Sequence, residues 1–93
     1  MEDPSKHPRH IQGYEGSFKD LASAIGKMTF DQVGTFLGEL AKDIESQAEA
    51  DLNKRGRKRL AKELFEAAEN VKKVQANILS AWKICEPYMK QND

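Results

Sequence analysis

The sequence predicts an all-α protein: a three-helix bundle built on a long antiparallel helical hairpin, with a short N-terminal helix and a flexible N-terminal tail. Apolar residues recur at alternating steps of three and four through the second half of the chain, a heptad pattern that indicates one long helix facing another. A second apolar stripe precedes it, and a glycine-containing turn separates the two. The long pattern comprises Leu60, Leu64, Ala67, Val71, Val74, Ile78, Ala81, Cys85 and Tyr88.

The composition limits both the size of the core and the class of partner. A chain of 93 residues forms one domain at most and buries a modest core. Its 15 basic and 15 acidic residues cancel, which argues against a uniformly basic nucleic-acid binder. The charge is divided, however, with a net −5 over residues 30–53 and a net +6 over residues 54–91. We therefore expect these two helices to attract each other.

The chain shows no sign of export or membrane insertion. Cys85 is the single cysteine, so no internal disulfide can form and a reducing compartment is favoured. No apolar stretch approaches the roughly 18 residues of a membrane span. Residues 1–17 lack the apolar centre of a signal peptide. We expect a cytoplasmic protein.

The first elements are a tail over residues 1–16 and a single helical domain over residues 17–91. The tail mixes proline and glycine with polar residues and has no period. A helix is expected over about 17–25, where Ser17 caps the first turn and Asp20 adds a favourable negative charge. Gly26 suits the left-handed residue that ends such a helix.

The second helix is expected over about 30–53. Thr29 and Gln32 have the spacing of a capping box, which marks its start. Its apolar stripe predicts the side that faces the third helix. The inward residues are expected to be Val33, Leu37, Leu40, Ile44, Ala48 and Leu52.

The third helix is expected over about 57–86, after a turn at residues 53–56. Pro87 should kink or stop it. If the chain reverses at this turn, facing residues should have numbers that total about 111, as Leu40 and Val71 do. The third helix then extends past the second, and the first helix should cover the overhang. The expected contacts join Phe18, Leu21 and Ile25 to Trp82, Cys85 and Tyr88.

A strip of small residues in the second helix is one candidate interface. Gly34 and Gly38 each weaken a helix by about 1 kcal/mol relative to alanine, so close approach of another backbone is a reason to have them. That backbone belongs either to the first helix or to a second copy of the chain. The predicted interface residues are Gly34, Phe36, Gly38, Phe65 and Leu79, the phenylalanines and leucine being apolar residues outside the hairpin seam.

A cluster of cations at the hairpin turn is a second candidate site. It can be a solvated turn, with Arg59 paired to Asp51, or a weak anion-binding site for nucleic acid or an anionic surface. No aromatic residue lies among the cations to stack a base. The cluster consists of Lys54, Arg55, Arg57, Lys58 and Arg59.

No cofactor, metal or catalytic site is predicted. Pro8 separates His7 from His10, and no other ligand is near them. The glutamates at helical spacing have no histidine beside them, unlike the carboxylate metal sites of helical bundles. The chain has no phosphate-binding glycine loop and no nucleophile with a base at a recognisable spacing, so we expect no enzyme.

The sequence therefore predicts a small helical protein–protein interaction module that forms a homodimer or binds a protein partner, without a membrane span. The alternative is a nucleic-acid or anionic-surface binder that uses the turn at residues 54–59.

Overall fold

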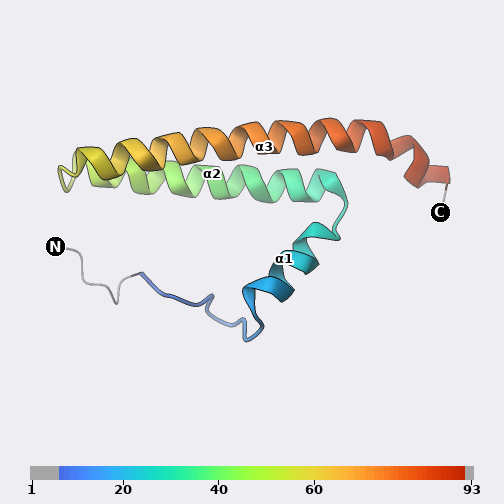
Figure 1. Cartoon of the computed structure of the whole chain (residues 1–93), viewed down its shortest axis with the longest axis horizontal. Helices are drawn as coiled ribbons and strands as arrows, with labels where there is room; N and C mark the ends of the chain where they lie inside the picture. The colour runs from blue at the N-terminus through green and yellow to red at the C-terminus, as the bar shows by residue number, and fades with distance from the viewer. Residues whose placement is uncertain (1–6, 92–93) are drawn as a thin grey trace.

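In the computed structural model, which describes residues 7–91, the chain forms three α-helices and no strand within that range. They are α1 (Phe18–Gly26), α2 (Phe30–Asn53) and α3 (Lys58–Gln91). Figure 1 shows α2 and α3 side by side and antiparallel along the long axis of the molecule. The all-α class, the long hairpin and the short N-terminal helix are confirmed. Residues 1–6 of the predicted tail lie outside the described residues, and residues 7–16 contain no helix.

The two N-terminal caps differ from each other. The Ser17 hydroxyl accepts a hydrogen bond from the Asp20 amide at 3.0 Å, as expected. Thr29 is also an N-cap residue, but its side chain makes no capping bond, so the expected capping box is not formed. The prediction that Gly26 is left-handed is wrong. It is the last residue of α1, and only Gly13 and Gly56 have positive φ among the described glycines.

The hairpin turn lies where the sequence places it. Gly56 has φ 65°, a conformation that favours glycine because it has no Cβ. The amide of Arg57 donates to the carbonyl of Asp51 at 2.8 Å, which closes the C-terminal end of α2. The amide of Ala61 then donates to the carbonyl of Arg57 and starts α3.

The α3 helix continues beyond the expected end at residue 86. Pro87 lies inside it, and the helix reaches Gln91. Figure 1 shows the ribbon bending near this end of α3, as expected where proline removes one backbone hydrogen bond and crowds the preceding turn.

The seam between α2 and α3 is made of small residues. The residues with almost no exposed surface are Ala41, Ala48, Ala61 and Ala68, and Gly34 is also buried. No large side chain is fully buried in the described part of the chain. The small residues repeat at intervals of seven on both helices, so they lie on the same side of each helix along its length.

The expected set of inward residues is therefore partly wrong. Leu40, Leu52, Leu60 and Val74 remain 39–49% exposed. Each helix is rotated about its axis so that alanine and glycine lie at the closest approach, and the larger side chains flank them. Small residues at the contact allow helix axes to come closer than leucine would.

The register along the hairpin is close to the expected one. The Leu79 side chain fills the space that a Cβ on Gly34 would take, and the Gln75 side chain does the same at Gly38. The residue numbers in both contacts total 113, against the predicted 111.

The expected packing of α1 on the end of α3 is wrong. Within the described residues, α1 contacts the start of α2 and does not contact α3. Figure 1 shows it projecting away from the hairpin, and none of its residues is buried. The amides of Lys27 and Met28 donate to carbonyls of α1, so the backbone keeps a helical turn beyond Gly26. This turn directs α1 away from the hairpin. Phe18 consequently remains 65% exposed, while Tyr88 on the overhang remains 64% exposed.

Candidate interaction surface

The rotation of the two helices gives the hairpin two different faces. Ala41 and Ala68 mark the direction in which each helix faces the other. Successive residues turn by about 100°, and in an antiparallel pair the corresponding flanks of both helices lie on one side. Large aliphatic residues occupy one such side, which we name the apolar face. It comprises Val33, Leu37, Leu40 and Ile44 of α2 and Leu60, Leu64, Val71, Val74 and Ile78 of α3.

The cavities support this assignment of faces. A shallow hollow of about 550 Å³ at the hairpin turn is lined by Leu60 and Leu64 of α3 together with Gln47 and Asp51 of α2. These residues lie on the flank that continues the apolar face, so the two flanks meet across the seam. His7 and Pro8 of the N-terminal segment line the same hollow.

Three residues of the apolar face are exposed to solvent, while Val33 is buried and the other five are half-buried. Leu40 is 39% exposed, Leu60 is 43% exposed and Val74 is 49% exposed. Single exposed leucines are ordinary, whereas large apolar patches on a monomer are often contact surfaces, so the apolar face is a candidate interaction surface.

The opposite side, which we name the polar face, is crossed by an ion pair. The Lys72 ammonium donates to a Glu45 carboxylate oxygen at 2.5 Å and lies 3.7 Å from Glu69. The hydrogen bond to Glu45 raises the pKa of Lys72, and the charges of both glutamates act in the same direction. A hollow of about 400 Å³ on this face is lined by Thr35, Gly38, Glu39, Lys42, Glu45, Lys72 and Gln75.

The predicted glycine strip is already occupied within the chain. Gly34 is buried against Leu79, and Gly38 lies against Gln75. The close neighbour within the chain is therefore α3 and not the first helix, which was one of the two alternatives that the sequence left open. The Gln75 amide also donates to the Gly34 carbonyl at 2.9 Å, which anchors this approach.

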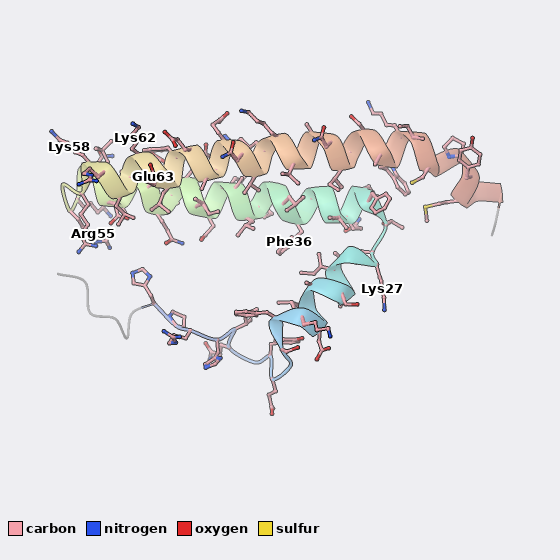
Figure 2. The ribbon with its side chains drawn as sticks, in the orientation of Figure 1. Lys27, Phe36, Arg55, Lys58, Lys62 and Glu63 are labelled. Atoms are coloured by element: carbon pink, nitrogen blue, oxygen red, sulfur yellow. The ribbon has the colours of Figure 1, made fainter. Side chains whose placement is uncertain are left out.

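The other predicted interface residues have different surroundings. Phe36 is 42% exposed and points from α2 toward the side on which α1 lies (Figure 2). Phe65 and Leu79 are half-buried. Phe65 lines a hollow of about 320 Å³ with Leu52, on the polar side of the seam. Of the five residues, Phe36 is therefore the most available to a partner.

The positive charge of the cationic turn is partly neutralised by a buried carboxylate of the same chain. Asp51 is buried, with 9% of its side chain exposed, and one carboxylate oxygen lies 3.3 Å from Arg55 Nη1 and 3.7 Å from Arg57 Nη1. The expected partner, Arg59, makes no ion pair in the part of the chain that the structure describes. Figure 2 shows Lys58 and Lys62 pointing outward on one side of the turn and Arg55 on the other. Lys54 and Arg59 are exposed.

Two structural roles differ from what the sequence indicated, which paired Asp51 with Arg59 and gave Gln75 no role. Asp51 lies four residues before Arg55, a spacing that brings side chains together on a helix, so this pair could have been found. Gln75 follows Ala61 and Ala68 at the same interval of seven, and that interval was the available signal for its place in the seam.

The remaining candidate groups stay apart. No group of three or more metal-ligating side chains occurs among residues 7–91, where His7 and His10 both lie in the exposed N-terminal segment. Cys85 is a half-buried free thiol on the α3 overhang. None of the helices that the structure describes is long and apolar enough to cross a membrane.

Comparison with known proteins adds no relative: no family model, curated protein or solved structure matches this chain. The apolar face and the cationic turn are thus the two surfaces from which a function can be argued.

Proposed function

We propose that this protein is an interaction module that presents the apolar face of its α2–α3 hairpin to a helical protein surface. The single observation that carries the proposal is the position of the large aliphatic side chains. They flank an alanine and glycine seam on one side of the molecule and stay partly exposed there. The proposal includes no catalytic step. The lone thiol agrees with a cytoplasmic place for the module.

The energetic support comes from what the hairpin lacks. Burial of apolar area contributes roughly 25 cal/mol per Å², and alanine buries little of it. A two-helix seam without a fully buried large side chain therefore leaves most of its hydrophobic stabilisation unused. Covering Leu40 and Val74 with a partner would bury apolar surface that the hairpin leaves exposed.

A site-specific photocrosslinker tests the proposal in cells that naturally produce the protein. We expect a benzoylphenylalanine at position 74, in place of Val74, to form adducts with the chain itself or with a second protein identified by mass spectrometry. The same probe at Ala76 is the matched control, because Ala76 lies one turn from Lys72 on the polar face. The adducts should disappear in Leu40→Lys. Equal adducts from both positions would exclude the apolar face as the contact surface.

The cationic turn supports a second candidate, binding of nucleic acid or another anionic surface. Lys58 and Lys62 project from the same side, and neither makes an ion pair among the described residues. Asp51 weighs against it, because this carboxylate engages two of the five predicted cations. Binding of a 20-base single-stranded DNA that weakens steeply with salt, and is lost in Lys58→Gln/Lys62→Gln, would support it. Salt-independent or absent binding contradicts it.

A further inference from the structure

We infer that the partner of the apolar face is a second copy of this chain, so that two hairpins pack face to face into a four-helix bundle. This inference rests on the proposed function and names its partner. In such a dimer the face contacts its own symmetry mate, an arrangement in which the same residues meet from both sides. Bundles of this kind bury their apolar flanks between four helices.

The size of the face is sufficient for a specific dimer. Its longer side, from Leu60 to Ile78 on α3, comprises 19 residues and spans about 28 Å at 1.5 Å per residue. Two helices packed about 8–10 Å apart form a face about 20 Å wide. The face therefore covers about 560 Å² per chain and about 1,100 Å² in a dimer, which exceeds the roughly 1,000 Å² expected of a specific interface.

The isolated chain also exposes more surface than a compact protein of its mass. Its solvent-accessible area is 7612 Å², whereas a compact monomer of 10.5 kDa exposes about 5,400 Å². The flat shape of the molecule, 54 × 29 × 14 Å between Cα atoms, contributes to this excess, because its thickness is close to that of one helix layer. A second layer is what the hairpin lacks.

The chemistry of the face favours a copy of itself over a charged partner. Between Val33 and Ile44 on α2, and between Leu64 and Ile78 on α3, the flank that forms this face contains no charged residue. Like surfaces can therefore meet without repulsion between equal charges. Asp51, at the turn end of the face, already has its arginine partners within the chain. A second copy is present wherever the chain is made, so it is available to cover the apolar face.

Sedimentation of the full chain over a dilution series from about 1 to 100 μM tests the inference. We expect a mass close to twice 10.5 kDa at the upper concentrations. Val74→Lys should raise the dimer dissociation constant by about 30-fold or more, the loss expected at an interface hot spot. Ile84→Lys is the matched control, because Ile84 is also a β-branched, exposed residue of α3 but lies on the overhang, outside the apolar face. It should change the constant by less than about threefold.

A measurement without substitutions guards against a variant that fails to fold. On dilution of methyl-labelled protein, the NMR signals of Leu40 and Val74 should shift, and that of Ile84 should not. A monomer at 100 μM overturns the inference, as does a dimer that Val74→Lys leaves intact or that Ile84→Lys weakens equally. If the chain is monomeric and the probe at position 74 crosslinks another protein, the proposed function stands and the homodimer does not.

Discussion

At the residue scale, Gly34 and Gly38 occupy similar positions on α2 but meet different neighbours. A Cβ on Gly34 would lie 2.5 Å from Leu79 Cδ2 and 2.9 Å from Leu79 Cγ. A Cβ on Gly38 would lie 2.5 Å from Gln75 Nε2, the far end of a flexible side chain. The leucine is held at its branch point, whereas the glutamine amide can move aside at the cost of its hydrogen bond to the Gly34 carbonyl. The two glycines should therefore respond differently to substitution.

We expect Gly34→Ala to lower the free energy of unfolding by about 1–2 kcal/mol, because overpacking at Leu79 exceeds the gain in helix propensity. Gly38→Ala should be neutral within about 0.5 kcal/mol, because the gain in helix propensity of about 1 kcal/mol offsets the loss of the Gln75 hydrogen bond, which contributes about 1 kcal/mol. Urea unfolding followed by circular dichroism measures both. A Gly34→Ala protein as stable as the wild type would show that α2 and α3 are further apart than described.

Asp51 offers a second test at this scale. Its buried carboxylate holds Arg55 and Arg57 across the turn. We expect Asp51→Asn to destabilise the protein by about 1–2 kcal/mol, since both charged contacts weaken at a buried site. Glu49→Gln, at an exposed acidic position of the same helix, should change stability by less than about 0.5 kcal/mol. Equal effects in urea unfolding would mean that general charge, and not this contact, stabilises the turn.

At the scale of the elements, one ion pair links the acidic α2 to the basic α3. Because the hydrogen bond to Glu45 raises the pKa of Lys72, the charged lysine stabilises the folded hairpin. This contribution is present in full below the ordinary lysine pKa of about 10.4 and is lost as the pH rises through the raised value. The exposed site keeps the contribution small.

We therefore expect Glu45→Gln to lower the urea midpoint at pH 8, and we expect this effect to shrink as the pH rises above about 10.4 and through the raised pKa of Lys72. Glu39→Gln is the control, because Glu39 pairs with Lys42 inside α2 and not between helices. A loss of stability in Glu45→Gln that stays constant over this range would rule out the Lys72 charge as its cause.

At the scale of the whole molecule, α1 and the α3 overhang are two apolar segments that do not meet within the chain. The packing of α2 on α3 therefore involves few contacts with α1. We expect Phe18→Ser to change the free energy of unfolding by less than about 0.5 kcal/mol. Val71→Ser, at a half-buried position of the apolar face, should cost about 1–3 kcal/mol. A large effect of Phe18→Ser in thermal unfolding would show that α1 is docked in solution.

The sequence by itself determined the three helices and their antiparallel pairing, with every helix boundary close to the observed one except the C-terminal end of α3. Heptad spacing, the Ser17 cap and Gly56 are local signals, and each acts within a few residues of the chain. It also predicted that the acidic helix would pair with the basic one, as Glu45 and Lys72 do.

Only the tertiary structure decided which side of each helix faces the other and where α1 lies. The heptad pattern contains a stripe of leucine and valine and a second stripe of alanine and glycine. The sequence of a single helix does not show which of the two stripes faces the partner helix. The packing of the two helices selects the alanine and glycine stripe, because the close approach along Gly34, Ala41 and Ala68 excludes large side chains from the seam. That choice leaves the apolar face open, and the surface available for binding follows from it.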